Sequence, residues 1–331
     1  MLPLVSICIP TYKNSLLLQD AIYSAINQTH KEIEIIVFDD CSNDETEEVV
    51  KEIARKDSRI FYYKSDINLR PPKSWNECIK KANGDFFIVL PQDDILLPEF
   101  ISKSLHTLEH NPTIGFVQNS FINTNRFLKP ISAVNHPGEI KLNSLRALEW
   151  QVKYKHCIPV SIIINKNVVN EYFMEDFWDD WAYFARIAYR HGFIFQPEPL
   201  AVNRSHKDQL NFKLLEEEKP AWEYIYDQVM SLYSILDKKD KKSGNALLDT
   251  YLRELSISMF FTCCKLALKG KRESKEIYRK ARKINKLLPF DYLIILEIYK
   301  KFYSKRTSND LQSTNIEQVN QAIRAAIKKI V

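Results

Sequence analysis

Two adjacent carboxylates follow a run of five apolar residues in the first half of the chain. Residues 86–90 read Phe-Phe-Ile-Val-Leu, and Asp93 and Asp94 come three residues later. Like charges at the end of a buried strand repel each other unless a cation lies close to them. Mg²⁺ and Mn²⁺ prefer oxygen ligands and take only one or two protein carboxylates when a diphosphate supplies others. The pair therefore predicts a divalent cation site; the alternative is that one aspartate caps the helix expected from Pro98.

A second acidic pair, Asp39–Asp40, has the same setting behind four apolar residues. Ser42 or Asn43 is a favoured residue type for capping the helix expected at 45–55. That cap leaves unexplained why two acids directly follow a buried strand. Asp39–Asp40 is therefore a further candidate for ligand binding.

The apolar runs before these acids belong to an alternation of short strands and helices. The expected strands are apolar throughout, as in parallel sheets with helices on both faces. They cover residues 4–10, 33–38, 60–63, 86–90 and 114–118, and the helices cover 16–27, 45–55, 74–82 and a segment from 98. This order predicts an α/β fold with a Rossmann-like, mostly parallel sheet flanked by helices.

Open sheets of this kind bind ligands beyond the carboxyl ends of their strands. The strand at 4–10 ends in Pro10–Thr11–Tyr12, and the two acidic pairs follow two other strands. All three clusters are expected in one crevice, and this coincidence indicates a site more strongly than any one cluster does.

The second half of the chain is less regular. Residues 119–155 are less regular, with Pro130, Pro137 and Gly138 as breakers, and a further strand is expected at 157–164. Aromatic and alanine residues at helical spacing predict a helix that begins at Asp179–Asp180. Residues 198–206 predict a strand that runs into a polar loop, and from 212 the pattern is helical.

Composition sets outer bounds on the function. The chain has 331 residues, 45% of them hydrophobic and only 6 of them glycine, as expected of a folded protein. Neither a signal peptide nor a membrane-spanning segment is expected from the pattern. The 6 scattered cysteines have no metal-ligand spacing, which predicts reduced thiols in a cytoplasmic protein.

Taken together, the motifs resemble the family 2 glycosyltransferases of GT-A fold. The resemblance covers about residues 4–210. It includes Pro-Thr-Tyr and Asn after the first strand, Asp-Asp-x-Ser-x-Asp-x-Thr after the second, and the segments "WNECIKKANGDFFIVLPQDDILLPEF" and "DDWAYFARIAYRHGFIFQPEPLAVNRSH".

The resemblance implies a nucleotide-sugar site. Asp40 would read a uracil-type base with support from Asp39, and the remaining implied contacts are Pro10, Thr11, Tyr12, Asn68 and Asn76. Family members often have an arginine where this chain has Trp75, so the diphosphate contact would fall to Arg70 or Lys73.

The resemblance also implies the metal and the base. Asp94 would ligate Mn²⁺ or Mg²⁺, Asp93 would bind ribose or orient the donor, and Asp180 would deprotonate the acceptor. His206 is a further candidate metal ligand, and its alternative is a structural or solvated histidine. For Asp180 the alternative is a helix cap or a carboxylate in the first helical turn. Many relatives have another acid where this chain has Pro91, which leaves Asp94 with fewer protein partners.

The function so implied is metal-dependent, inverting transfer of a sugar from a UDP-type donor to a saccharide acceptor that is expected to be lipid-linked, in capsule or O-antigen synthesis. Residues 1–210 would form the catalytic domain and 211–331 an α-helical region. Sugar nucleotidyltransferases are one alternative, but they have a glycine-rich loop where this chain has "PTYKNS". A non-catalytic, membrane-associated binding module is another, and the presence of Asp180 counts against it.

The positive charge belongs to the C-terminal part. Residues 211–331 hold 24 basic and 15 acidic residues, and 262–306 hold 14 and 4. The second segment fits either an amphipathic helix on an anionic membrane, which would place the protein at the inner face of the plasma membrane, or a solvated face of a helical bundle. Both interpretations stay open. Nucleic-acid binding is not expected, because the catalytic crevice is acidic and no such motif occurs.

Overall fold

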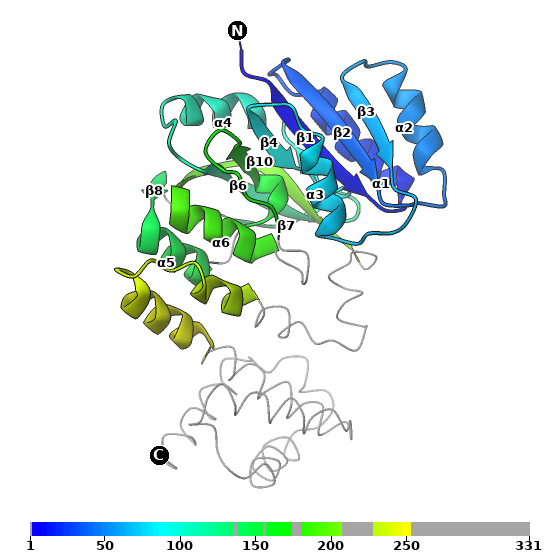
Figure 1. The fold of residues 1–331 in the computed structure, drawn as a ribbon. Helices are drawn as coiled ribbons and strands as arrows, with labels where there is room; N and C mark the ends of the chain where they lie inside the picture. Colours follow the sequence, from blue (N-terminus) through cyan, green and yellow to red (C-terminus); the bar gives the residue numbers. More distant parts are fainter. Residues whose placement is uncertain (1, 135–137, 155–156, 174–179, 207–227, 253–331) are drawn as a thin grey trace, which may run out of the picture. The chain divides into compact units, whose positions relative to one another are not determined.

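A computed structural model describes residues 2–134, 138–154, 157–173, 180–206 and 228–252 (Figure 1). The chain divides into two units, Met1–Asp249 and Thr250–Val331, and the description below concerns the first. The domain boundary expected at residue 210 and the basic segment 262–306 lie outside the described residues, so both stay predictions.

Parallel strands form one half of a 10-stranded sheet. Their order is β3 (Ile60–Lys64), β2 (Ile33–Asp39), β1 (Val5–Thr11) and β4 (Phe86–Val89). Every residue of β1, β2 and β4 is buried. The apolar runs therefore predicted both the presence and the two-sided burial of these strands.

The other half of the sheet mixes directions. Strand β9 (Ile162–Asn165) pairs antiparallel with both β4 and β6 (Phe116–Asn125). Strand β10 (Phe193–Ser205) runs parallel to β6, and the two-residue β5 (Ile95–Leu96) pairs antiparallel with β10. The predicted α/β class is confirmed, and the sheet as a whole is mixed: pairing is parallel throughout the β3-β2-β1-β4 half and largely antiparallel in the other.

Helices cover both faces of the sheet (Figure 1). Ile7 and Ile9 of β1 share a buried cluster with Leu18 of α1. Cys8, which points the other way along the strand, contacts the carbonyl oxygen of Cys78 in α3. The helices are α1 (Ser15–Ile26), α2 (Thr46–Ala54), α3 (Lys73–Lys80), α4 (Phe100–Glu109), α5 (Ser144–Tyr154) and α6 (Asp180–His191), followed by helical residues within 228–252.

Residues 119–134 and 138–154 hold more regular structure than their breakers indicate. Strand β6 continues to Asn125, and it is followed by β7 (Pro130–Ala133), β8 (Ile140–Leu142) and α5. All four residues of β7 are exposed, and β8 has only three residues. Strand β7 has no alternation of buried and exposed residues, and the three residues of β8 are too few to establish a period.

The strand predicted at 157–164 starts later than expected. Pro159–Ser161 forms a 3₁₀ turn (η1), and β9 begins at Ile162. Pro159 occupies the first position of the turn, where its fixed φ and missing N–H are tolerated.

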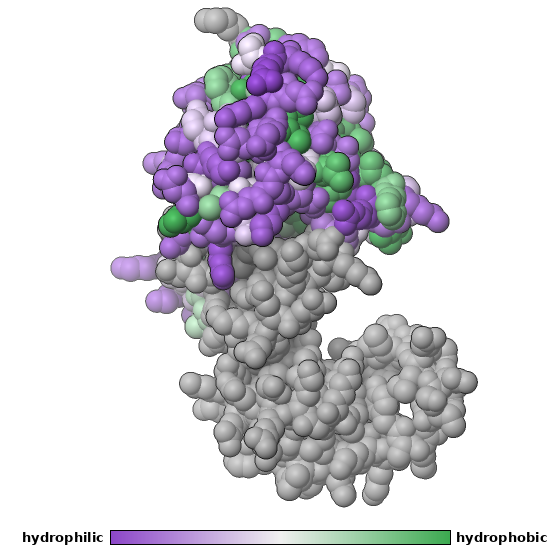
Figure 2. All heavy atoms as spheres, turned by 90° about the vertical axis from the view of Figure 1, so that its right-hand side faces the viewer, coloured by the Kyte–Doolittle hydropathy of each residue, from purple (hydrophilic) through white to green (hydrophobic). Residues whose placement is uncertain are grey.

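The surface over β3 and α2 is mainly hydrophilic, with hydrophobic residues in small separate groups (Figure 2). Salt bridges within this part, such as Lys51–Glu47 and Lys64–Glu47, are exposed and add little to stability. Among the described residues, no helix is long and apolar enough to cross a membrane.

A buried polar cluster holds the amino ends of three strands together. Glu34 of β2 accepts hydrogen bonds from the hydroxyl of Ser6 in β1, from the backbone and side-chain amides of Asn83, and from the backbone amide of Gly84. A Cβ at residue 84 would lie 2.7 Å from both the Leu4 carbonyl and the Ser6 hydroxyl, so only glycine fits there. The strands are fixed at this end, and their carboxyl ends remain for binding.

Glu34→Gln is expected to lower the free energy of unfolding at neutral pH by about 1–3 kcal/mol, because hydrogen bonds to a buried charge are lost. Burial raises the pKa of Glu34, but these hydrogen bonds outweigh it and leave the pKa below its ordinary value of 4.5. A lowered acid pKa stabilises the fold at pH values above the ordinary one, and that stabilisation is lost as pH falls through the folded-state value. Denaturant unfolding of wild type and variant from pH 7 to pH 3 should therefore show the gap closing.

The exposed Glu52→Gln is the matched control, since Glu52 forms only an exposed pair with Lys56. A gap of equal size for both variants, or one that does not depend on pH, would contradict the role given to Glu34.

Candidate functional site

The carboxyl ends of β1 and β2 lie side by side. Thr11 is the register partner of Asp39, and the backbone amide of Asp40 donates to the Thr11 carbonyl at 2.8 Å. This parallel pairing brings the Pro10–Thr11–Tyr12 turn against the first acidic pair, as the sequence predicted.

Hydrogen bonds from the protein itself satisfy both acids of this pair. Asp39 accepts from the backbone amide of Ser42 at 2.8 Å and from the hydroxyl of Tyr62 at 2.7 Å. The two oxygens of Asp40 accept from the backbone amides of Leu69 and Arg70 at 2.7 and 2.9 Å. Burial, opposed by these hydrogen bonds and aided by the charge of Asp39, raises the pKa of Asp40. Asp40 thus fixes the loop after β3, in which Asn68 and Arg70 are exposed.

The turn after β1 has left-handed backbone at Lys13 and Asn14, with φ of 60° and 68°. The backbone amide of Lys13 donates to the Ser42 hydroxyl at 2.7 Å. Ser42 therefore holds this turn instead of capping α2, whose N-terminal cap is Glu45 without a side-chain hydrogen bond. The cap interpretation of Ser42 is wrong, and Tyr12 is left 42% exposed beside the acids.

Gln92 joins this turn to the second acidic pair. Its side-chain oxygen accepts from the Thr11 hydroxyl and, at 3.0 Å, from the backbone amide of Tyr12. Sequence reasoning missed Gln92, although a polar residue between a buried strand and two acids is a usable signal. Through it, the ends of β1 and β4 form one surface.

The pairing of β5 brings residues of another strand close to Asp93 and Asp94. Its antiparallel pairing with β10, Ile95 opposite Val202, brings the end of β10 against the acidic pair. The backbone amide of Arg204 donates to Asp94 at 2.9 Å, and Nε2 of His206 lies 3.0 Å from Oδ2 of Asp93.

Asp94 lies in an environment that disfavours its charge. It is 4% exposed, and burial together with the neighbouring charge of Asp93 raises its pKa well above the ordinary range. The guanidinium of Arg204 is itself 2% exposed and pairs with Asp20 of α1 at 2.9 Å. Helix α4 has Glu99 as its N-terminal cap and no side-chain cap hydrogen bond. The helix-cap interpretation of Asp93 and Asp94 is therefore wrong.

These residues fit a cation that takes only part of its ligands from protein. Asp94 is a buried carboxylate with raised pKa, and Asp93 holds His206 close by. In the part of the chain that the structure describes, no three His, Cys, Asp or Glu side chains are grouped so as to hold a metal ion alone. A bound diphosphate would have to complete such a site.

Asn76 lies apart from this cluster. Its side-chain amide donates to the Phe173 carbonyl at 2.9 Å and its oxygen accepts from the Phe173 amide at 3.0 Å. The neighbouring Trp75 meets the Phe173 ring edge to face at 5.3 Å between centroids. Both residues hold the segment that precedes α6, so the contact of Asn76 with a nucleotide stays a prediction.

Asp180 is the first residue of α6. Its Oδ1 accepts from the backbone amide of Trp181 at 2.7 Å and from the side chain of Gln228 at 3.4 Å. Its charge contributes to raising the pKa of the buried Cys157 thiol, after the larger effect of burial. Asp180 is thus a first-turn carboxylate close to Cys157, and this position is compatible with catalysis as well.

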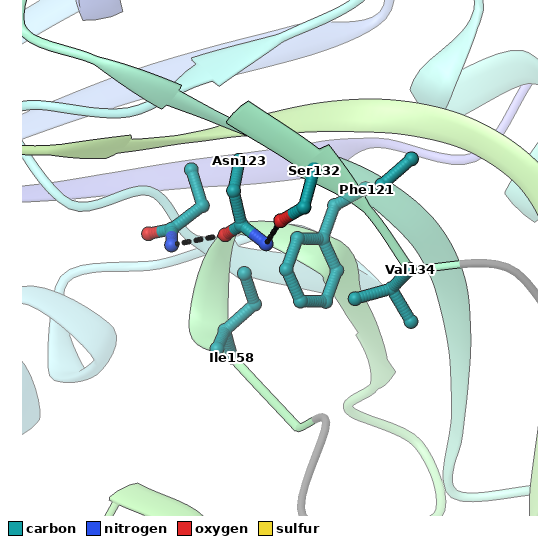
Figure 3. A pocket seen from close by; sticks show the side chains of 7 residues that line it. Phe121, Asn123, Ser132, Val134 and Ile158 are labelled. Atoms are coloured by element: carbon teal, nitrogen blue, oxygen red, sulfur yellow. Dashed lines mark hydrogen bonds between the residues drawn. The ribbon is translucent and has the colours of Figure 1, made fainter. Parts of the chain in front are cut away.

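An open pocket of about 450 Å³ lies over β6, β7 and the end of β10. Asn203 donates to Asn123 at 2.8 Å, and Asn123 donates to the Ser132 hydroxyl at 3.0 Å, which gives a polar floor (Figure 3). Phe121, Val134 and Ile158 form apolar walls. Asn203 immediately precedes Arg204, whose backbone amide donates to Asp94. Ile158 immediately follows Cys157, whose pKa is raised in part by the charge of Asp180.

The family model described as glycosyl transferase family 2 matches residues 6–173. The chain belongs to this family. The predicted resemblance is confirmed, and the matched range contains β1 to β9 and both acidic pairs.

The curated relatives align with a smaller part of this chain than the family model does. A GalNAc(5)-diNAcBac-PP-undecaprenol beta-1,3-glucosyltransferase of Campylobacter jejuni is 35% identical over 116 residues, 35% of this chain and 36% of the relative. A UDP-Glc:alpha-D-GlcNAc-diphosphoundecaprenol beta-1,3-glucosyltransferase of Escherichia coli is 31% identical over 143 residues, 42% of this chain and 56% of the relative. The matched part thus spans between about a third and somewhat more than half of these relatives.

Solved structures of this fold align over most of the chain. Residues 1–349 of Staphylococcus aureus TarS in complex with UDP-GlcNAc give a TM-score of 0.65 at 18% identity, over 84% of this chain and 79% of that one. A Pyrobaculum calidifontis mannosyltransferase in complex with GDP-Man and Mn²⁺ gives 0.57 at 15%, over 92% and 88%. The predicted GT-A fold is confirmed.

Asp40→Asn is expected to lower the free energy of unfolding by about 1–3 kcal/mol, because the partly buried bonds to the Leu69 and Arg70 amides lose their charge and one of them loses its acceptor oxygen. Proteolysis within residues 65–72 should become faster at the same time. Chemical unfolding and mass spectrometry of the fragments check both results.

Asp66→Asn is the matched control, since Asp66 is an exposed acid in the same loop. If Asp40→Asn were as stable as wild type but no longer bound a UDP-sugar, Asp40 would act on the nucleotide and not on the loop.

Proposed function

We propose that this chain is an inverting glycosyltransferase. It moves one sugar from a nucleoside diphosphate sugar, of the UDP type, to a saccharide on a lipid diphosphate during synthesis of a surface polysaccharide such as capsule or O-antigen. One observation carries the proposal: three strand ends bring Tyr12, the loop held by Asp40 and the acidic pair Asp93–Asp94, with Asp94 buried, to one edge of the sheet.

Family membership and the relatives support this choice. Both glucosyltransferases described above have undecaprenol diphosphate acceptors in their names, and the TarS complex holds a UDP-sugar. A sugar nucleotidyltransferase is a weaker candidate, because the family match and the glycine-free turn after β1 both count against it.

The donor lies over the ends of β1 and β2. Tyr12 is exposed there and can stack on the base, while the loop that Asp40 fixes offers Asn68 and Arg70. Arg70 supplies the positive charge that Trp75 does not provide. Asp39 accepts from Ser42 and Tyr62, and through them it positions the turn beside the donor.

The cation lies at Asp94, with His206 beside it. When bound, a divalent cation offsets the charge that develops on the leaving diphosphate. Asp93 holds His206 in place at 3.0 Å, and β10 holds Asp94 through the Arg204 amide. Peripheral attachment to a membrane through residues 262–306 is compatible with this function and stays a prediction.

Asp180 is the base. Its carboxylate takes the proton of the acceptor hydroxyl while that oxygen bonds to the anomeric carbon. The bond from this carbon to the diphosphate oxygen breaks, and its electron pair leaves with the nucleoside diphosphate. Attack from the face opposite the leaving group inverts the anomeric configuration.

The acceptor saccharide occupies the pocket over β6 and β7. The amides of Asn203 and Asn123 and the Ser132 hydroxyl offer donors and acceptors to sugar hydroxyls, and Phe121 and Ile158 offer apolar surface. Two chain neighbours of its lining residues support this choice: the Arg204 amide after Asn203 contacts Asp94, and the charge of Asp180 acts on Cys157, which precedes Ile158.

Asp180→Asn is expected to lower kcat for transfer by about 10²–10⁴-fold, since the amide cannot take the acceptor proton. Donor affinity, measured by calorimetry with UDP-sugars in the presence of Mn²⁺, should stay within roughly twofold. Asp94→Asn is the contrasting variant, and it should lose metal-dependent donor binding. Transfer by Asp180→Asn at the wild-type rate would remove Asp180 from the role of base.

Asn123→Ala is expected to raise the KM for the acceptor by about three- to tenfold, because one hydrogen bond to the sugar and the link to Ser132 are lost. The rate of donor hydrolysis without acceptor should not change. Asn111→Ala, a partly buried asparagine at the end of α4, is the control. An unchanged acceptor KM in Asn123→Ala would place the acceptor elsewhere.

A further inference from the structure

The hairpin between β6 and β7 carries exposed apolar side chains at its tip. Phe127 is 85% exposed, more than any other large hydrophobic residue in the described part of the chain. Ile131 is 64% and Leu128 42% exposed. Three such side chains within five residues form a local apolar surface of the kind that marks an interaction site.

The tip is held in one conformation by its own hydrogen bonds. The side-chain oxygen of Asn125 accepts from the backbone amides of Phe127 and Lys129 at 2.9 and 3.0 Å. The Leu128 amide donates to the Asn125 carbonyl, and the Asn125 amide donates to the Lys129 carbonyl, both at 3.0 Å. Leu128 adopts a left-handed φ of 62° within this turn. The exposure of the apolar side chains is therefore built into the turn.

These hydrogen bonds also prepare the tip for an environment poor in water. The amides of residues 127, 128 and 129 all donate within the turn, and Pro130 has no amide hydrogen. Entering an apolar phase with unpaired amides is unfavourable, and this turn avoids that penalty for three successive residues.

The charge around the tip has one sign. Arg126 and Lys129 flank Phe127 and Leu128, and residues 119–134 contain no acidic residue. Long basic side chains beside apolar ones are typical of segments that rest in the headgroup region of anionic lipids. A protein partner needs an extended surface of complementary shape, whereas this tip is a small apolar projection flanked by basic side chains.

We propose that residues 126–131 insert into the headgroup region of an anionic bilayer. The inference rests on the proposed function in one respect, the lipid-linked acceptor. The same hairpin lines the acceptor pocket at its base through Asn123 and Ser132. With about 3.3 Å per strand residue, the pocket lies roughly 10 Å from the tip. Insertion of the tip thus holds the pocket at the height of a saccharide attached to the membrane by a diphosphate.

Vesicle co-sedimentation of the full chain tests the contact. The double variant Phe127→Ser with Ile131→Ser should bind vesicles of phosphatidylglycerol and phosphatidylethanolamine roughly tenfold more weakly than wild type. Phe61→Ser, which removes a 44% exposed phenylalanine from β3, is the matched control and should bind as wild type does. Lys129→Glu should weaken binding to these vesicles and leave binding to phosphatidylcholine vesicles unchanged.

Tryptophan quenching tests insertion directly. Phe127→Trp and Phe61→Trp each add one indole to the same background of 5 tryptophans. With lipids brominated on their acyl chains, only the emission added at position 127 should be quenched. Equal quenching at both positions, or wild-type binding by the double serine variant, overturns the proposal.

Two further measurements distinguish this proposal from self-association of the chain and from failure of the proposed function. Sedimentation velocity without lipid should be the same for wild type and the double serine variant; a change would show that the tip joins two copies of the chain. Transfer to a short-chain, water-soluble acceptor should be unaffected in that variant. Its absence in wild type would overturn the proposed function without touching the membrane contact.

Discussion

Two pairs of like charges at the carboxyl ends of β2 and β4 are the constraint on which the arrangement of the site depends. Asp39, Asp40, Asp93 and Asp94 end or follow β2 and β4, with β1 between them. Asp39 and Asp40 are balanced by neutral donors of the protein, namely Ser42, Tyr62, Leu69 and Arg70 through hydroxyl or backbone groups. Asp94 receives one such donor and keeps a pKa well above its ordinary range. The first pair therefore organises loops, and the second retains an affinity for positive charge.

Strand β5 has a large effect for its length. Two residues, Ile95 and Leu96, connect the acidic pair to β10. This pairing and that of β10 with β6 together bring Arg204 toward the end of β4. The ion pair of the buried Arg204 with the half-exposed Asp20 fixes the same end of β10 to α1. A site assembled from two distant parts of the sequence thus includes a short antiparallel contact in the mixed half of the sheet.

Much of the first half of the fold could be predicted from sequence, because β1, β2 and β4 are apolar on both faces and leave little ambiguity. The strands β5, β7 and β8 were not predictable, since two to four residues show no periodicity and β7 is wholly exposed. The strand ends that carry the acids were found for a physical reason, the placing of ligands beyond parallel strands. The hydrogen-bond partners of each acid could not be predicted from sequence. A bond such as that from the Leu69 amide to Asp40 links residues whose proximity no local sequence pattern encodes.

The pairing of β6 with β10 positions both the pocket residues and the backbone amide that contacts Asp94. They pair in parallel with Asn123 opposite Asn203 and Thr124 opposite Arg204. Successive residues of β10 thus serve different tasks: Asn203 lines the pocket, and Arg204 holds Asp94. A shift of β10 by one residue would move both side chains out of these positions and turn each to the other face of the sheet, so the bulges between Gln196 and Ala201, which set its register, matter to both sites. Because β6 continues into the exposed hairpin, this pair of strands positions the proposed acceptor pocket, the Arg204 amide that contacts Asp94 and the tip that we propose to meet lipid.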